Sequence, residues 1–323
     1  MLNMQMGAPL KGARLQKVKD FLLEQSLRME DDAQYTVCLF DDCDELVGTG
    51  SFANGVLKYI AVAEKAQGEG ACATIVSELV SYAYRMGYKH LFVFTKPANE
   101  RQFTSLGFFP MVKTDSVLML ENRRDGLDSF LRSIKEECLG TIGAIVANCN
   151  PFTLGHRYLM ETAAKSVDLL HIFVLSENRS QFDADVRYRL VKEGTADIAN
   201  ARVHRSADYL ISSATFPTYF LKDNVDASVV NADLDIQLFA KRIAPALGIT
   251  KRFVGTEPFC PVTRAYNERM KQVLPEYGVE VIEIERKDGI SASKVRQLLA
   301  EGEKDKVRTL VPECTYKYLY GGE

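Results

Sequence analysis

The stretch TIGAIVANCNPFTLGHRYLMETAAKSV, residues 141–167, decides the fold expected for the second half of the chain. Residues 141–149 are almost continuously apolar, as in a strand that is buried on both faces of a parallel sheet. A loop containing Pro151 and Gly155 follows, and the residues after it predict a helix. Because this order is typical of α/β folds, we expect a parallel sheet that binds its ligand at the carboxyl ends of the strands.

The remainder of the second half continues the alternation of strands and helices. The expected elements are strands at 169–176, 251–257 and 280–286 and helices at 180–194, 234–249 and 291–302. Alternation of this kind indicates right-handed crossovers between parallel strands. We therefore predict a Rossmann-like domain with a parallel sheet.

The first half has a different pattern, with short strands around one central helix. Asn54-Gly55 predicts a hairpin turn, because both residues tolerate a positive φ. Gly87 is expected to end the helix. The strands are expected at 35–40, 46–52, 56–62 and 90–95, and the helix is marked by Ile75, Val76, Leu79, Val80 and Ala83 at helical spacing.

The boundary between the two halves is placed in a charged segment. Residues 121–139 carry many charges and are expected to be largely helical. We predict an N-terminal α+β domain over 1–125, a linker helix over 126–140 and a second domain over 141–323.

Composition narrows the class of protein. The chain has 323 residues, 46% hydrophobic and 26% charged, which suits two globular domains. The net charge of −3, with acids and bases intermixed, argues against a nucleic-acid-binding surface or a membrane anchor. No run of apolar residues reaches the ~18 needed to span a membrane, and the N-terminus does not resemble a signal peptide, so we expect a cytoplasmic protein.

The cysteines predict neither disulfides nor a zinc site. Seven are scattered along the chain without a CxxC pair or a Cys/His cluster. We expect reduced, mostly buried thiols. A redox-sensitive thiol at Cys149, beside NPFTLGH, is the less favoured alternative.

The segment NPFTLGH, residues 150–156, is suited to binding an anion. A helix N-terminus presents unpaired N–H groups and about half of an elementary positive charge. Gly155 would let the backbone approach a ligand closely, and His156 at the helix start could reach a phosphate oxygen. Its hydrogen bond would stabilise charge that develops on the α-phosphate or on departing pyrophosphate.

The segment ISASKVR, residues 290–296, has a complementary layout. Ser291 and Ser293 could cap a helix and bind phosphate, and Lys294 adds a cation. Arg296 offers a planar fork of donors to phosphate oxygens.

Together, NPFTLGH and ISASKVR resemble the HxGH-type nucleotidyltransferase superfamily, which binds ATP or CTP with a TxGH or HxGH loop and an ISSTxxR segment. Thr153 stands at the first histidine of that pattern and His156 at the second. Ala292 replaces a serine, while Ile290, Ser291, Ser293 and Arg296 match. The resemblance implies catalytic roles for His156 and Arg296. The residues that it implies in ATP binding are Asn150, Pro151, Phe152, Thr153, Gly155, His156, Gly255, Glu257, Ser291, Ser293, Lys294 and Arg296.

Two weaker segments fit the same resemblance. VGTEP, residues 254–258, ends a strand where the superfamily usually lines the adenine or ribose pocket. The expected helix at 180–194 carries Arg187 and Arg189, either of which could approach phosphate. For both segments, solvated turns and a charged helix face are equally good interpretations.

The first half resembles the GNAT acetyltransferase fold. Gln67, Gly68 and Gly70 match its Q/R-G-x-G-x-G/A loop at a helix start, and a later LGF turn also matches. Such a loop would hold the diphosphate of a CoA-like group through backbone N–H groups. The departures are Cys72, where Gly or Ala is preferred, Glu69, which adds a negative charge, and Phe103, which replaces a proton-donating tyrosine. We favour recognition of a CoA-like group, or of a protein that carries one, over acetyl transfer by this half.

A GNAT-like half followed by an HxGH half, with ANCNPFTLGHRYL at 147–159, resembles the citrate lyase ligase family. The resemblance implies an acid–thiol ligase that uses ATP, with Mg²⁺ as the expected metal. Acetate would form acetyl-adenylate with release of pyrophosphate. The thiol of a dephospho-CoA-derived group on the acyl carrier subunit of citrate lyase would then take the acetyl group and release AMP. The identity of the acid comes from this resemblance alone, and no metal ligand is indicated.

Two other functions stay open at this point. One is an adenylyltransferase of the pantetheine-phosphate or NMN type, which would need a basic pocket for its phosphate acceptor. The other is a non-catalytic sensor of CoA or a nucleotide, which His156 and Arg296 argue against.

Overall fold

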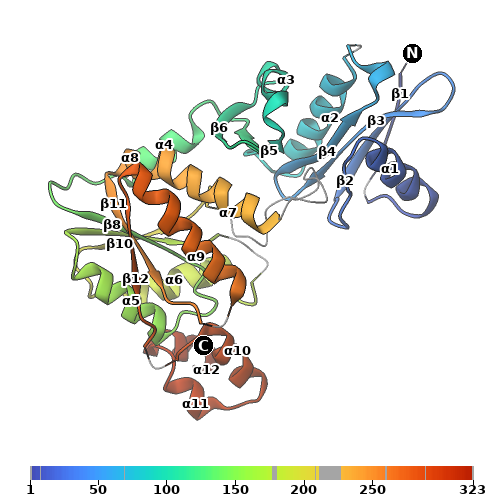
Figure 1. Ribbon diagram of the computed structural model, residues 1–323. Coiled ribbons are helices and arrows are strands. Elements are labelled where there is room, and N and C mark those ends of the chain that lie inside the picture. The colour runs from blue at the N-terminus through green and yellow to red at the C-terminus, as the bar shows by residue number, and fades with distance from the viewer. Residues whose placement is uncertain are drawn as a thin grey trace. The chain divides into compact units, whose positions relative to one another are not determined.

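The computed structural model describes residues 2–7, 9–68, 70–176, 180–207, 209–210, 227–258, 260–287 and 289–321, with backbone only at 227–229. These residues form two compact units (Figure 1). The described residues up to Leu127, with 227–234, make the first unit, and the others make the second.

The first unit is built on a seven-stranded sheet in the order β1-β2-β3-β4-β5-β7-β6. Helix α2 packs its apolar face on this sheet, burying Ile75, Val76, Leu79 and Ala83 as predicted. The strands are β1 Asn3–Gly7, β2 Tyr35–Phe40, β3 Leu46–Ala53, β4 Val56–Val62, β5 Phe92–Thr95, β6 Phe109–Lys113 and β7 Leu118–Glu121. The helices are α1 Gly12–Glu24, α2 Ala71–Arg85 and α3 Glu100–Ser105, with short 3-10 turns at Glu64–Ala66 and Pro97–Asn99.

Several local predictions for this unit are confirmed. The strands expected at 35–40, 46–52 and 56–62 are present, and Asn54 and Gly55 form the turn with φ values of 48° and 83°. Strands β4 and β5 are parallel and paired at Val56↔Phe92 and Leu57↔Val93. Because β4 continues to Val62, the two strands diverge toward their carboxyl ends. The sequence interpretation missed β1 and α1.

The charged segment after β7 is less helical than expected. Residue 121 belongs to β7, and helix α4 covers Gly126–Ile134. The buried carboxylate of Glu121 accepts a hydrogen bond from the Leu127 N–H, at 3.0 Å, and so holds the start of the helix. The expectation of a helix from residue 121 was therefore wrong. The domain limits at 125 and 141 stay a prediction.

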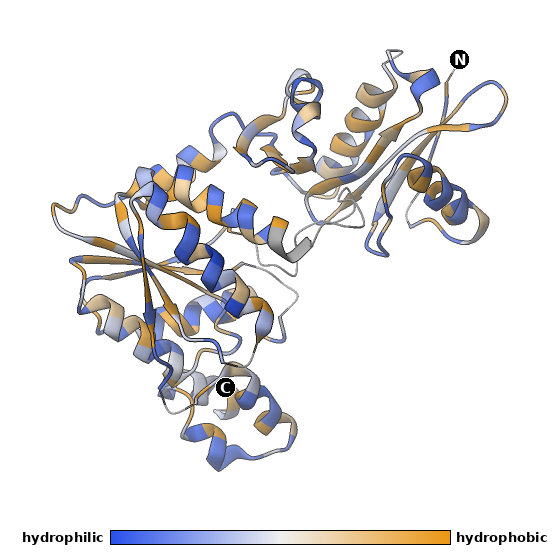
Figure 2. Ribbon diagram, viewed as in Figure 1, coloured by the Kyte–Doolittle hydropathy of each residue, from blue (hydrophilic) through white to orange (hydrophobic). Residues whose placement is uncertain are grey.

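The second unit contains a five-stranded sheet in the order β10-β9-β8-β11-β12, and all of its strand pairs are parallel. Figure 2 shows hydrophobic residues concentrated in its strands. The strands are β8 Ile142–Ala147, β9 Leu169–Val174, β10 Ala201–Arg205, β11 Ile249–Gly255 and β12 Glu280–Ile284. The helices are α5 Leu154–Ala164, α6 Ala184–Gly194, α8 Ala244–Leu247, α9 Pro261–Val273, α10 Ala292–Ala300, α11 Lys304–Arg308 and α12 Glu313–Tyr320, with a 3-10 turn at Leu274–Tyr277. Helix α7 Ala227–Leu238 belongs to this unit only from Asp235 onward.

The predicted parallel sheet is confirmed, whereas the helix expected at 234–249 is interrupted. A π-helical turn at Phe239–Ile243 separates α7 from α8, and β11 begins at Ile249. Pro245 lacks an N–H, so a regular helix could not continue its hydrogen bonding through this segment. Strand β10 and helices α9, α11 and α12 were not predicted.

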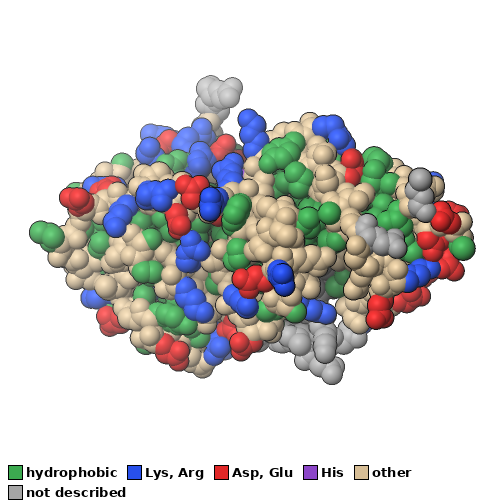
Figure 3. All heavy atoms as spheres, turned by 90° about the horizontal axis from the view of Figure 1, so that it is seen from above, with side chains coloured by type: hydrophobic (Ala, Val, Ile, Leu, Met, Phe, Trp, Pro, Cys, Tyr) green, Lys and Arg blue, Asp and Glu red, His purple; other side chains and the backbone are tan. Residues whose placement is uncertain are grey.

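The surface has the mixed charge that the composition indicated. On the face shown in Figure 3, Lys and Arg side chains lie interspersed with Asp and Glu side chains. None of the described helices combines the length and apolar character that crossing a membrane requires. All seven cysteines are free, but only Cys38 and Cys149 are buried, so the expectation of mostly buried thiols was wrong.

Candidate functional site

Three segments of the second unit meet at the carboxyl edge of its sheet. NPFTLGH follows β8, Thr256 and Glu257 follow β11, and ISASKVR comes after β12. Strands β9 and β10 lie on one side of β8, and β11 and β12 on the other. Open α/β sheets usually bind their ligand at such a reversal of strand order, in a crevice outside the strand ends, so the crevice is expected between the loops of β8 and β11.

The side chain of His156 is fixed by the start of helix α5. Thr153 is the N-cap, and its Oγ1 accepts from the His156 N–H at 3.3 Å. In return, Nδ1 of His156 accepts from the Thr153 N–H at 3.1 Å. This is a capping box in which histidine takes the place of the usual Glu or Gln. With Nδ1 acting as an acceptor, the proton of the neutral ring lies on Nε2.

His156 is uncharged at neutral pH. Burial, and after it the positive charge of Arg286, lowers the pKa of His156 to about 4. The Phe152 ring lies nearly parallel to the imidazole, with 6.2 Å between ring centroids. His156 therefore offers an oriented, neutral N–H donor at Nε2.

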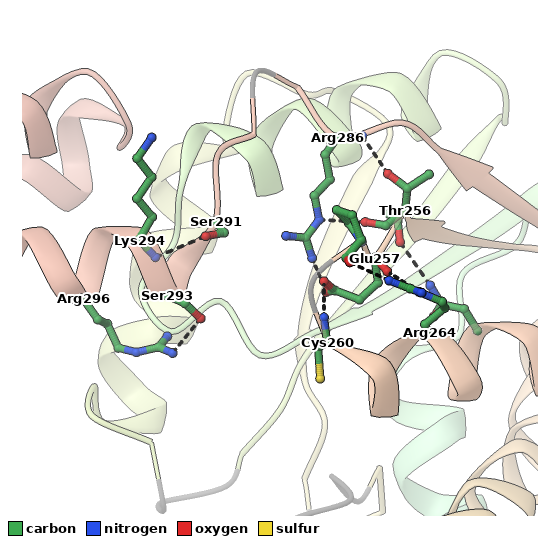
Figure 4. Close-up of polar contacts among 12 residues, drawn as sticks. Thr256, Glu257, Cys260, Arg264, Arg286, Ser291, Ser293, Lys294 and Arg296 are labelled. Atoms are coloured by element: carbon green, nitrogen blue, oxygen red, sulfur yellow. Dashed lines mark hydrogen bonds and ion pairs between the residues drawn. The ribbon is translucent and has the colours of Figure 1, made fainter.

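Arg296 joins the two halves of the predicted motif. Its Nη1 donates to the Asn150 carbonyl oxygen at 2.5 Å, and its Nη2 donates to Ser293 Oγ at 3.0 Å. Ser291 caps helix α10 by accepting from the Lys294 N–H at 3.2 Å, and the Lys294 side chain is exposed (Figure 4). Arg296 thus links ISASKVR to the start of NPFTLGH.

Gly155 lies at a close contact between these segments. A Cβ at this position would lie 3.1 Å from the Ile290 carbonyl oxygen and 3.5 Å from the Ile290 side chain. The absence of a side chain at Gly155 therefore allows α5 to rest against the start of ISASKVR. This is a different reason from the close ligand approach that the sequence suggested.

Two hydrogen bonds with the C-terminal region hold NPFTLGH in place. The buried hydroxyl of Thr315 donates to the Phe152 carbonyl oxygen at 3.0 Å. The Leu154 N–H donates to the Leu310 carbonyl oxygen at 2.9 Å. The Phe152 ring is fully buried in the core, so it cannot itself contact a nucleotide, and its place in the predicted ATP set rests on its backbone. Pro151 is also buried.

Arg286 is a site residue that the sequence interpretation missed. Its N–H donates to Thr256 Oγ1 at 3.1 Å, its Nε donates to the Thr256 carbonyl oxygen at 2.7 Å, and its Nη2 is paired with Glu257 (Figure 4). The signal available in the sequence was a basic residue directly after a strand that neighbours the crevice. Glu257, predicted to bind ATP, is nearly buried and holds Arg286 and the Cys260 N–H. The Gly255 carbonyl oxygen accepts from Asn267 at 3.1 Å.

Of the two arginines considered in α6, Arg187 does not serve a phosphate, whereas the role considered for Arg189 stays a prediction. Arg187 is fully buried and donates to the carbonyl oxygens of Asn148, Leu175 and Phe182 at 2.8, 2.8 and 3.0 Å. It therefore fastens the ends of β8 and β9, which contradicts the phosphate-binding alternative. The Arg189 guanidinium stacks on Tyr318 at 5.6 Å.

Cys149 is unsuited to redox chemistry. It is buried, and burial raises the pKa of its thiol to about 12. The redox alternative is thereby disfavoured, because a reactive cysteine needs an accessible thiolate.

The predicted CoA-like loop of the first unit is open. Gly68 and Gly70 have φ values of 87° and 77°, and no described atom lies within 4 Å of a Cβ built at either position. Gln67 donates to the Val62 carbonyl oxygen at 3.3 Å. Glu69 lies outside the described residues. Phe103 is buried and lines a hollow of about 180 Å³ between the diverging ends of β4 and β5, where its ring has no proton to donate.

Comparison with known proteins finds a matching family model for each half of the chain. A family model described as the citrate lyase ligase C-terminal domain matches residues 142–319, and one described as the acetyltransferase (GNAT) family matches residues 8–108. The citrate (pro-3S)-lyase ligase of Klebsiella pneumoniae is 42% identical over 317 residues, covering 95% of this chain and 92% of the relative. That of Escherichia coli strain K12 is 40% identical over 321 residues, covering 95% and 90%. That of Haemophilus influenzae is 39% identical over 319 residues, covering 95% of each.

Solved structures resemble single parts of the chain. Escherichia coli ElaA is 14% identical, with a TM-score of 0.33, and is covered completely by 38% of this chain. Thermotoga maritima TmcAL bound with alpha-thio ATP is 15% identical, with a TM-score of 0.37 and 55% coverage of each chain. These similarities are too low to bear on activity.

Proposed function

The chain belongs to the citrate (pro-3S)-lyase ligase family of enzymes, and we propose that it joins acetate to a thiol at the expense of ATP. In the first step, an acetate oxygen attacks the α-phosphorus of ATP, and acetyl-adenylate and pyrophosphate form. In the second, a thiol sulfur attacks the acetyl carbonyl, the thioester forms, and AMP and a proton are released. The thiol belongs to a dephospho-CoA-derived group on the acyl carrier subunit of citrate lyase.

The observation that carries this proposal is the contact of Arg296 with NPFTLGH, the segment that also holds His156. Arg296 is tied to the Asn150 carbonyl oxygen, and His156 is locked into the cap of α5. A helix N-terminus and nearby cations are suited to a polyphosphate. The neutral Nε2–H of His156 would donate to the charge that grows on the α-phosphate, and Arg296 and Arg286 would balance the departing pyrophosphate.

ATP is proposed as a substrate, and Mg²⁺ would arrive with it. Among the described residues, no group of three or more His, Cys, Asp or Glu side chains could hold a metal ion. Mg²⁺ commonly binds through substrate phosphates with few protein ligands, so a dedicated protein cage is unnecessary. Bound in this way, it would neutralise charge on the polyphosphate.

For the first unit we propose recognition of the CoA-derived group without catalysis. The open backbone at Gly68 and Gly70 suits a diphosphate, and Phe103 lacks the proton that a leaving thiolate requires. We also propose that the first domain ends at residue 125 and that the second begins at residue 141.

The proposal is tested by pyrophosphate exchange. Purified chain is incubated with ATP, Mg²⁺, labelled pyrophosphate and one small carboxylate at a time: formate, acetate, propionate or citrate. We expect label to enter ATP in the presence of acetate and without any thiol. Exchange that ignores carboxylates but depends on pantetheine phosphate or NMN would instead establish the adenylyltransferase alternative.

A further inference from the structure

A separate hollow lies at the carboxyl edge of the second unit's sheet, at the ends of β9 and β10. Its volume is about 490 Å³. Ser176 borders it just after β9, Arg205 at the end of β10, Asp183 and Asp185 at the start of α6, and Phe130 on α4. A volume of this size falls in the range of small-molecule sites and far exceeds what acetate alone needs.

One short segment, residues 180–183, links this hollow to the proposed nucleotide site. The Phe182 N–H donates to Asn150 Oδ1 at 3.1 Å, and Asn148 Nδ2 donates to Ser180 Oγ at 3.2 Å. The residues between Ser180 and Phe182 therefore lie against the start of NPFTLGH, and the next residue, Asp183, already borders the hollow. A ligand in the hollow would be one short loop away from the nucleotide.

The charges around the hollow do not suit an anion. Among the described residues that border it, Arg205 is the one cation, and it is paired with Asp185 and stacked over Tyr188 at 4.3 Å. Asp183 is a second carboxylate, held as the cap of α6 by the Asp185 N–H at 2.8 Å. A phosphate ester or a second carboxylate would meet two acids and a guanidinium that is already paired. An uncharged chain with amide groups would meet hydrogen-bonding groups and the Phe130 ring.

We propose that this hollow receives the uncharged, thiol-bearing amide arm of the acyl acceptor, an inference that rests on the proposed function. The arm's sulfur approaches the acetyl-adenylate from the β9–β10 side of the crevice. There the sulfur–carbon bond forms, the bond between the acetyl carbon and the phosphate oxygen breaks, and AMP leaves with the electron pair. The thiol proton passes to solvent.

The test fills the hollow without touching the nucleotide site. Ala184 borders the hollow at the first position of α6 and is partly exposed, so Ala184→Trp adds bulk there and Ala184→Ser is the matched control. Three reactions are compared: acetate-dependent pyrophosphate exchange, trapping of acetyl-adenylate by hydroxylamine, and acetylation of pantetheine as the free thiol probe. Exchange also reports that the variant is folded.

We expect Ala184→Trp to lower kcat/KM for pantetheine by at least about 10-fold, equivalent to about 1.4 kcal/mol. Exchange and hydroxamate formation should stay within about twofold of the unmodified enzyme, as should all three reactions of Ala184→Ser. Equal pantetheine acetylation by Ala184→Trp would overturn the inference, as would a parallel loss of exchange. So would exchange by the unmodified enzyme without any acetylation of pantetheine. Absence of acetate-dependent exchange in the unmodified enzyme would count against the proposed function instead.

Discussion

Two helix N-termini are proposed to bind phosphate groups in this chain, and they are built in opposite ways. Helix α5 starts in a capping box between Thr153 and His156, and the preceding residues receive hydrogen bonds from Thr315 and Arg296. Helix α2 starts at Gly70, which has a φ of 77° and no side-chain cap. The first is held by side chains from distant parts of the sequence. The second is bare backbone.

The difference indicates which terminus does chemistry. Donors that stabilise a transition state must be oriented before the reaction, because reorienting them would cost energy at the barrier. The α5 start meets that requirement, since its histidine is fixed by both the N–H and the hydroxyl of Thr153. The bare loop before α2 can wrap a diphosphate with its N–H groups, but it brings no general acid to the acyl group.

The largest effect is expected at His156. His156→Glu keeps an acceptor for the Thr153 N–H, because Glu is a normal partner in a capping box, but its carboxylate has no N–H to replace the donor at Nε2. Acetate-dependent exchange should fall by about 10²-fold or more, with little change in thermal stability. His156→Ala should lose the same activity and also melt at a lower temperature. Exchange at the original rate in His156→Glu would refute the catalytic role.

Arg296 should come next. Arg296→Lys keeps the positive charge but loses the planar fork that binds the Asn150 carbonyl oxygen and Ser293 together. We expect at least about a 10-fold loss of kcat/KM for ATP in exchange, because the two halves of the site are no longer tied. Lys294→Ala, at an exposed position on the same helix, is the comparison and should lose less. An equal loss of kcat/KM for ATP in the two variants would show that the contact of Arg296 with Asn150 and Ser293 does not contribute to exchange.

Thr315 tests whether the hydrogen bond from helix α12 to NPFTLGH contributes to catalysis. Thr315→Val removes the hydroxyl that donates to the Phe152 carbonyl oxygen. The free energy of unfolding should fall by about 1 kcal/mol, and kcat for exchange should fall with it while KM for ATP changes little. Thr315→Ser restores the donor and should recover kcat. A stability loss without any change in kcat would show that the contact is purely structural.

The pH dependence of stability follows from the pKa of His156. The pKa is lowered to about 4 by burial and by Arg286, against about 6.5 in the unfolded chain. Between these values the unfolded chain binds more protons, so the free energy of unfolding falls as pH drops from about 6.5 toward 4. His171 and His204 have pKa values lowered to about 4 in the same way and add to this slope. Urea unfolding of His156→Gln at several pH values should show the slope reduced by about one proton, or ~1.4 kcal/mol per pH unit.

The smallest effect is expected at the bare terminus. Gly68→Asp and Gly68→Asn place side chains of the same shape at a φ of 87°, and both residue types tolerate positive φ better than most. They differ by one negative charge. We expect Gly68→Asp to raise KM for the carrier about threefold relative to Gly68→Asn, through repulsion of the diphosphate, with exchange unchanged in both. Identical KM values for the two variants would show that this loop does not bind the diphosphate.

The fold and the paired motif were accessible from the sequence because both depend on local patterns. Continuous apolar runs gave the parallel strands, and NPFTLGH and ISASKVR each have recognisable residues at fixed spacing. The sequence could not predict the roles of Arg286, Thr315 and Leu310, because these roles depend on which segments the sheet order and the C-terminal helices bring together. The two interpretations of Arg187 stayed open for the same reason, since its burial against Asn148 and Phe182 is a tertiary property.

The central claim is that an acetate oxygen attacks the α-phosphorus of ATP at the start of α5. It is tested most directly with acetate labelled with ¹⁸O in both oxygens, ATP and the thiol acceptor, followed by mass spectrometry of the products. The account predicts one ¹⁸O atom in the phosphate of AMP for each thioester formed, and none in pyrophosphate. AMP without label, or label found in pyrophosphate or inorganic phosphate, would contradict it.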